Sequence, residues 1–151
     1  DNCRVPIVNA LSEIAHPCQA LADAQTLLEH GIELESMHLA WLGDGNNVCL
    51  SLMELAAIMG GRMTVVTPAS HRPCAKLAAE IDAVAARTGA TIALTDDPAA
   101  IKGAHAVYTD AWISMGQKDC PDKIAALRAA GIAVADSPAD LGTTLKNAMK
   151  R

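Results

Sequence analysis

The sequence predicts an α/β protein in which five parallel strands alternate with five helices. Apolar runs of strand length alternate with segments of helical periodicity, which is the pattern of β-α units wound into a parallel sheet. Hydrophobic residues make up 51% of the 151 residues, yet the chain has two Trp, one Tyr and no Phe. We therefore expect an aliphatic core and, from the chain length, a single domain over residues 1–151.

The expected elements follow one another as a regular series. Strands are expected near residues 37–42, 63–66, 90–94, 105–109 and 132–135. Helices are expected near residues 17–30, 47–59, 73–88, 122–130 and 138–149. The predicted fold is a doubly wound five-stranded parallel sheet of order 3-2-1-4-5 with helices on both faces, of the flavodoxin-like or Rossmann-like kind.

The first expected helix begins at His16 and Pro17. Proline suits the first helical position because its missing N–H costs nothing there, and this places His16 at the N-cap. An imidazole at that position faces the positive end of the helix dipole, which disfavours its protonated form. We expect His16 to act as a neutral hydrogen-bond donor; a plain capping role is the alternative.

The segment GDGNN at residues 43–47 joins the first expected strand to the second helix. The backbone N–H groups of such a turn can bind an anion. A dinucleotide fingerprint would require a third glycine where Val48 stands, so the G-x-G is weak support for NAD. A tight strand-to-helix turn is the alternative.

Asp110 lies just beyond the fourth expected strand and is followed by Ser114 and Met115. Ligand-binding groups of an open parallel sheet gather at the carboxyl ends of its strands. A carboxylate there suits an ammonium group, because charge-assisted hydrogen bonds are about twice as strong as neutral ones. For an isolated Asp at a strand end, a solvated or capping residue is the alternative.

The final segment is expected to complete the sheet. Pro121 can open a helix and Gly131 can close it, while Ser137 with Asp140 gives a capping pattern for the last helix. Without this β-α unit the sheet would end in an exposed edge, which is a liability for pairing with other chains. The tail is therefore interpreted as the unit that closes the sheet.

Three motifs together resemble the second, ornithine-binding domain of the ornithine carbamoyltransferase family. They are HPCQALADAQTL at residues 16–27, WLGDGNNV at 41–48 and AVYTDAWISMGQ at 106–117, and the resemblance covers about residues 5–117. It implies that L-ornithine and carbamoyl phosphate are the small-molecule partners. The parent reaction converts carbamoyl phosphate and L-ornithine to L-citrulline and phosphate, without a cofactor.

The resemblance also implies a role for each matching residue. His16 and Gln19 would act on carbamoyl phosphate, and Asn47 would hold the α-carboxylate and α-amino group of ornithine. Asp110 and Ser114 would bind the amino acid, with Asp110 also positioning the attacking δ-amine. The backbone of Met115 would receive the ornithine carboxylate. Leu50 departs from the polar residue often found at its place in the family.

Two family features are absent from the printed sequence. It contains neither the Ser-Thr-Arg-Thr loop of the carbamoyl-phosphate domain nor a His-Cys-Leu-Pro segment. Residues 121–151 resemble instead the C-terminal end of a succinyl-CoA synthetase α subunit. We interpret the chain as a chimera, an engineered or excised ornithine-binding domain that is inactive alone. A working carbamoyltransferase and a CoA- or nucleotide-binding flavodoxin-like module are the alternatives.

Charge and composition argue against several other classes of function. The formal charge of −5 comes without a basic run, so no nucleic-acid partner is expected. No apolar run reaches the length of a membrane span. The five cysteines are odd in number and form no C-x-x-C pair, which favours free thiols in the cytoplasm over a metal site. His30, His38, His71 and His105 show no ligand spacing and are assigned to surface or core, and the sequence leaves the oligomeric state open.

Overall fold

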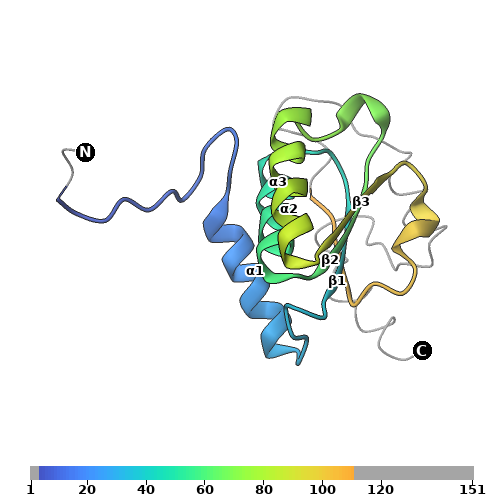
Figure 1. The fold of residues 1–151 in the computed structure, drawn as a ribbon, viewed down its shortest axis with the longest axis horizontal. Helices are drawn as coiled ribbons and strands as arrows, with labels where there is room; N and C mark the ends of the chain where they lie inside the picture. The colour runs from blue at the N-terminus through green and yellow to red at the C-terminus, as the bar shows by residue number, and fades with distance from the viewer. Residues whose placement is uncertain (1–3, 111–151) are drawn as a thin grey trace, which may run out of the picture. The chain divides into compact units, whose positions relative to one another are not determined.

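The computed structural model describes residues 4–110, which form four parallel strands and the helices that connect them (Figure 1). The α-helices are α1 (Pro17–Glu29), α2 (Asn47–Met59) and α3 (Ala75–Thr88). The strands are β1 (His38–Leu42), β2 (Arg62–Val66), β3 (Thr91–Thr95) and β4 (Ala106–Tyr108). Two short 3-10 turns, η1 (Ala69–His71) and η2 (Pro98–Ile101), complete the described part.

The strand order is β3-β2-β1-β4, and every neighbouring pair is parallel. Trp41 of β1 is in register with Val65 of β2 and Tyr108 of β4. The predicted order is thereby confirmed for four strands, and each element lies within two residues of its expected bounds. The fifth strand near 132–135, and the helices near 122–130 and 138–149, lie outside the described residues and stay predictions.

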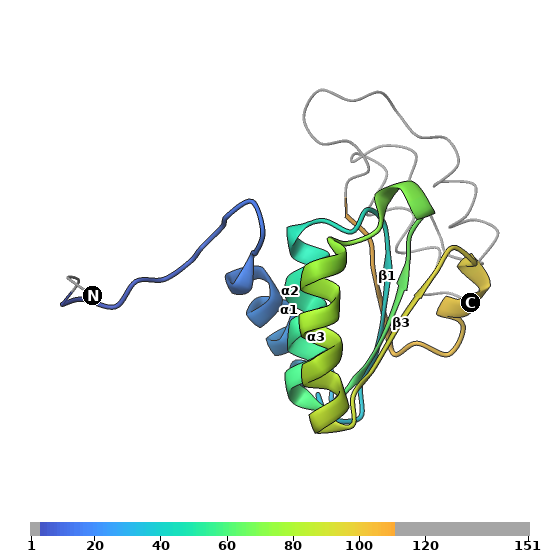
Figure 2. The same cartoon turned by 45° about the horizontal axis from the view of Figure 1, so that its top comes forward.

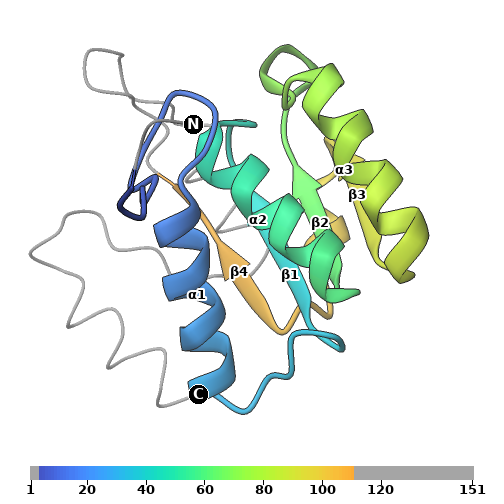
Figure 3. The ribbon, with the colours of Figure 1, turned by 60° about the vertical axis from the view of Figure 1, so that its left-hand side comes forward.

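The three α-helices of the described part all pack on one face of the sheet, and η2 lies on the other (Figures 2 and 3). The expectation of helices on both faces is therefore not met by the described residues. The cause is the direction of winding. From β1 through β2 to β3 the sheet grows one way, and right-handed crossovers then place α2 and α3 on the same face. The return from β3 to β4 is made by a 3-10 turn rather than a helix.

The core lies between the sheet and α2. Leu52, Met53, Ala56 and Ala57 of this helix have no exposed surface, and all five residues of β1 are buried. A central parallel strand is typically a near-continuous apolar run, as residues 39–42 of β1 are. The core is aliphatic as expected, with one aromatic exception: the Trp41 ring stacks on Tyr108, with centroids 5.1 Å apart.

Residues 4–11 extend away from the helices (Figure 1) and leave large apolar side chains in solvent. Val5, Ile7 and Val8 are 67–79% exposed, and Leu11 is 64% exposed. In the described part of the chain, no helix has the length and apolar character needed to cross a membrane.

Candidate functional site

His16 occupies the N-cap of α1, as predicted, with Pro17 at the first helical position. Its side chain makes no capping hydrogen bond. Its backbone N–H donates instead to the Ser51 hydroxyl at 2.8 Å, and that hydroxyl donates to the Asn47 carbonyl at 2.9 Å. The start of α1 is thus tied to the first turn of α2 by backbone and hydroxyl groups. The imidazole of His16 takes no part in this link.

Gln19 lies in the first turn of α1 and pairs with an acidic residue one turn later. Its side-chain amide donates to Asp23 Oδ1 at 3.0 Å. The other carboxylate oxygen, Asp23 Oδ2, and the Nδ1 atom of His16 are both buried and have no hydrogen-bond partner among the described residues. Burial raises the pKa of Asp23, while the Gln19 hydrogen bond and the nearby His16 act to lower it. His16, Gln19 and Asp23 therefore form one polar cluster.

The GDGNN turn uses its backbone N–H groups within the protein. Gly43 N–H donates to the Val66 carbonyl at 3.2 Å, and Gly45 N–H donates to the His71 carbonyl at 2.7 Å. A side chain at Gly45 would overlap the backbone of Pro73, so only glycine fits there. The structure favours the tight strand-to-helix turn over an anion-binding loop at these positions.

Asn46 caps α2 and also reaches across the sheet. Its Oδ1 accepts hydrogen bonds from the N–H groups of Val48 and Cys49, at 3.0 and 3.1 Å. Its Nδ2 donates to Asp110 Oδ2 at 2.8 Å. One asparagine side chain therefore satisfies the start of α2 and joins the loop after β1 to the loop after β4. The carboxyl ends of two adjacent strands are linked at this point.

Asn47, the asparagine assigned to ornithine from the sequence, makes a different contact. Its amide N–H donates to the Ser12 carbonyl at 2.7 Å. Its Oδ1 makes no hydrogen bond with the described residues, so a free acceptor remains. The side chain thus joins residues 4–16 to α2. Its Oδ1 atom can still accept a hydrogen bond from an N–H group.

Tyr108 of β4 is influenced by two carboxylates of this region, Asp23 and Asp110. Burial raises the pKa of its phenol, and the charges of Asp23 and Asp110 raise it further. Its ring is held by the stack on Trp41, whose indole N–H donates to the Asp44 carbonyl at 3.1 Å. Tyr108 therefore connects the cluster at the start of α1 to Asp110 through electrostatic contact.

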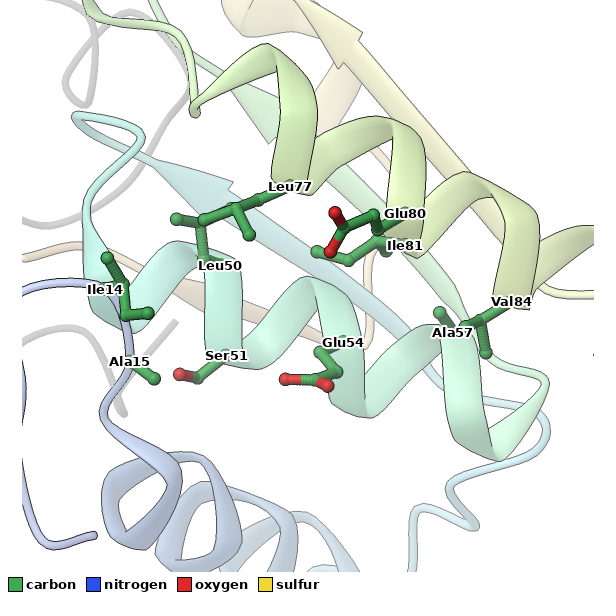
Figure 4. Close-up of a pocket in the computed structure, with 10 residues that line it drawn as sticks. All are labelled: Ile14, Ala15, Leu50, Ser51, Glu54, Ala57, Leu77, Glu80, Ile81 and Val84. Atoms are coloured by element: carbon green, nitrogen blue, oxygen red, sulfur yellow. The ribbon is translucent and has the colours of Figure 1, made fainter.

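A groove of about 300 Å³ lies nearby, between α2 and α3 (Figure 4). Apolar side chains line most of it, with Glu54 and Glu80 on facing helices and Ile14 and Ala15 at one end. Its lining includes none of the residues predicted to bind ligand. We place the candidate site at the carboxyl edge of the strands, where Asn46 and Asp110 meet.

Outside this region, His38 has structural hydrogen-bond partners. His38 is buried, with its Nε2 2.9 Å from the Thr64 hydroxyl and its Nδ1 3.3 Å from the Gly103 carbonyl, and burial lowers its pKa. Among the described residues, no three His, Cys, Asp or Glu side chains are grouped to hold a metal ion. Cys18, Cys49 and Cys74 are free thiols, and burial raises the pKa of Cys49.

Sequence comparison agrees with this arrangement of motifs. The family model described as aspartate/ornithine carbamoyltransferase, Asp/Orn binding domain, matches residues 35–134. The chain belongs to this family. The match extends past residue 117, where the motif resemblance ended, into the segment compared above with succinyl-CoA synthetase.

Individual carbamoyltransferases show the same relationship. An ornithine carbamoyltransferase of Shewanella oneidensis is 54% identical over 74% of this chain and 37% of its own length. One from Synechocystis is 46% identical over 81% of this chain and 40% of its own length. The solved ornithine carbamoyltransferase of Pyrococcus furiosus is 37% identical with a TM-score of 0.72, over 83% of this chain and 40% of that one. The chain therefore spans 37–40% of these carbamoyltransferases.

The structure places three further residues beside the predicted ones, and the roles of His16, Gln19, Asn47 and Asp110 stay predictions. Asn46, Asp23 and Tyr108 were missed, while Ser114 and Met115 lie outside the described residues. Asn46 had a usable signal, because asparagine is a preferred N-cap and the helix after it was predicted. Asp23 and Tyr108 had none, since their importance comes from neighbours distant along the chain.

Proposed function

We propose that this chain is the L-ornithine-binding part of an ornithine carbamoyltransferase and that it needs a separate carbamoyl-phosphate-binding part for turnover. The observation that carries the proposal is the Asn46–Asp110 hydrogen bond of 2.8 Å. It brings the loops after β1 and β4 together at the carboxyl edge of the sheet. This is the place where open parallel sheets bind ligands.

The amino-acid side of the site is formed by Asp110 and Asn47. The Asp110 carboxylate attracts an ornithine ammonium and orients the δ-amine for attack. Asn47 offers a free Oδ1 acceptor, because its N–H is given to Ser12. This acceptor suits the α-ammonium of ornithine. Ser114 and the backbone of Met115 would receive the α-carboxylate.

The carbamoyl side of the site is formed by His16 and Gln19. The Nδ1 atom of His16 is buried, so Nε2 is the nitrogen that can reach a ligand. We propose that it donates to the carbonyl oxygen of carbamoyl phosphate. This bond strengthens as negative charge grows on that oxygen in the tetrahedral intermediate. The intermediate arises when the δ-amine forms the C–N bond to the carbonyl carbon. When it collapses, the C–O bond to phosphate breaks, phosphate leaves with the electron pair, and the amine nitrogen loses a proton.

The chain alone is expected to give no detectable turnover. Holding two reactants in the right geometry is worth up to about 7–11 kcal/mol of the barrier. In the part of the chain that the structure describes, the site is formed at one edge of one sheet. Asp110 is only half-buried there, so its attraction for an ammonium is weakened by water. The exposed apolar side chains of residues 5–11 also suit a chain that is normally covered by further protein.

The origin of residues 121–151 as a succinyl-CoA synthetase tail remains our proposal, as does the chimeric or excised nature of the chain. The family match to residue 134 limits the segment to which that origin can apply. A cytoplasmic location is likewise proposed, from the free thiols. A CoA- or nucleotide-binding module is not favoured, since the N–H groups of Gly43 and Gly45 are given to protein carbonyls.

A citrulline assay at millimolar substrates, with calorimetric titration of ornithine, CoA and ATP, tests the proposal. We expect no citrulline from the chain alone, weak heat with ornithine, and none with CoA or ATP. Asp110→Asn should abolish the ornithine signal, whereas Asp96→Asn, at the exposed end of β3, should leave it unchanged. Turnover by the chain alone that is lost in Asp110→Asn would contradict the need for a second part. Heat with CoA would favour the other class.

A further inference from the structure

The amide of Gln19 has a defined direction in the structure. Its Nε2 donates to Asp23 Oδ1 at 3.0 Å. An ionised carboxylate only accepts hydrogen bonds, so it can pair with the NH₂ end of the amide and never with the oxygen end. With Nε2 held by Asp23, Gln19 Oε1 is the atom left to meet a ligand.

The same helix contains a second pair of this kind that serves as an internal comparison. Gln25 Nε2 donates to Glu29 Oε1 at 2.8 Å, with the same spacing of four residues, but both side chains are exposed. The Gln19–Asp23 pair is half-buried, and Asp23 Oδ2 is buried without a partner among the described residues. A buried polar atom left unpaired costs stability. Helix stabilisation alone, which Gln25 and Glu29 provide in water, does not require that cost.

The surroundings of Asp23 tie it to the rest of the site. His16, from the start of α1, interacts with its charge, as does Tyr108 from β4. Among the described residues, Nδ1 of His16 is the other buried side-chain polar atom without a partner. Asp23 therefore interacts with both groups proposed to act on carbamoyl phosphate: it accepts a hydrogen bond from Gln19, and the nearby His16 acts to lower its pKa.

We propose that Asp23 is a positioning residue that locks the Gln19 amide so that its oxygen faces the ligand. The site then presents an acceptor where the carbamoyl NH₂ group would lie, and it favours a carbamoyl group over an acetyl group, which has no N–H to donate. This consequence rests on the proposed function. The locking itself is a property of the chain without ligand.

The experiment follows the side-chain amide of Gln19 by NMR in the ligand-free chain while the pH is lowered. The Gln19 NH₂ signals should shift with the same midpoint as the Asp23 carboxyl carbon. In Asp23→Asn this shift should be lost, and the signals should broaden or double as the amide takes both directions. Asp23→Glu, which keeps a carboxylate, should restore a pH-dependent shift. Glu29→Gln is the matched control and should alter the Gln25 signals alone.

A second variant keeps the proposal testable if Asp23→Asn fails to fold. Gln19→Met removes the donor, and the midpoint of Asp23 should then move upward, because the lost hydrogen bond acts to lower it. Gln19 signals unchanged by Asp23→Asn, or an Asp23 midpoint unchanged by Gln19→Met, would overturn the proposal. No ligand is present in these measurements, so failure of ornithine binding in the calorimetric titration would be a separate result.

Discussion

Helices α1 and α2 lie on the same face of the sheet and have 13 residues each, but they are built for different purposes. Eight residues of α2 are buried, its start is capped by Asn46, and its end is closed by Gly60 in a left-handed conformation. Only Ala20, Ala24 and Leu27 of α1 are buried, and its N-cap His16 makes no side-chain cap. Among the described residues, no buried side-chain polar atom of α2 lacks a hydrogen-bond partner, whereas at α1 the buried Nδ1 of His16 and Oδ2 of Asp23 have none.

This difference separates the part that supports the fold from the part that carries chemistry. A sequence selected only for stability satisfies every cap and buried polar group, and local violations of that rule concentrate at functional sites. We therefore expect the body of α2 and its turn to contribute more to stability than α1 does, and the start of α1 to be the less stabilised of the two helix starts. The following predictions test this expectation, beginning with the largest effect.

Leu52→Ala should destabilise the protein by about 2–5 kcal/mol, because it removes a fully buried side chain from α2 and leaves a cavity. Leu21→Ala in α1, where the side chain is 63% exposed, should change stability by no more than about 0.5 kcal/mol. Urea unfolding followed by circular dichroism measures both. Equal losses in the two variants would remove the basis for the comparison.

Gly45→Ala should cost about 1–3 kcal/mol, because the added methyl would overlap the backbone of Pro73 and force the turn before α2 to move. The control is Gly31→Ala, just after α1. No atom lies within 4 Å of a side chain there, so its positive φ of 75° is the main cost, about 1 kcal/mol. The same unfolding assay applies. A smaller loss at Gly45 than at Gly31 would show that the turn can relax.

Asn46→Ala should lower the free energy of unfolding by about 1 kcal/mol through loss of the cap on α2, and it also removes a partner of Asp110. His16→Ala should have a smaller effect, because no capping bond is lost and an unpaired buried nitrogen is removed. Thermal unfolding of the two variants side by side gives the ranking. A larger loss for His16→Ala would mean that the imidazole stabilises α1 after all.

Asp23→Asn should change how stability depends on pH, with the smallest effect of the series. The folded-state pKa of Asp23 is raised by burial, so the folded chain holds the proton more tightly than the unfolded chain. This contribution is present at low pH and is lost as the pH rises from the unfolded value of about 3.8 through the folded pKa. Relative to Asp23→Asn, the parent chain should lose stability over that range. A parent chain that gains stability there would contradict burial as the dominant cause.

Much of the fold could be predicted from local signals in the sequence. Pro17 marks the start of α1, and the expected range 47–59 is that of α2. The strand order follows from β-α alternation and right-handed crossovers, which apply to any sheet of this type. The resemblance to the family was visible in the motifs at residues 16–27, 41–48 and 106–117, which contain His16, Gln19, Asn47 and Asp110. The family model matches residues 35–134, which include the second and third of these motifs.

Contacts between distant residues were decided only by the tertiary structure. Asn46 and Asn47 are adjacent in sequence, yet Asn46 bonds to Asp110, 64 residues away, and Asn47 bonds to Ser12, 35 residues away. The position before the predicted helix marks Asn46 as a cap, but no local pattern gives the distant partner of either amide, because those partners depend on the strand pairing that brings β1 beside β4. The burial of Asp23 likewise depends on residues that are distant along the chain. The sequence by itself therefore determined which elements form and in what order, since those follow from local propensity and chain direction; packing alone decided which polar side chains meet.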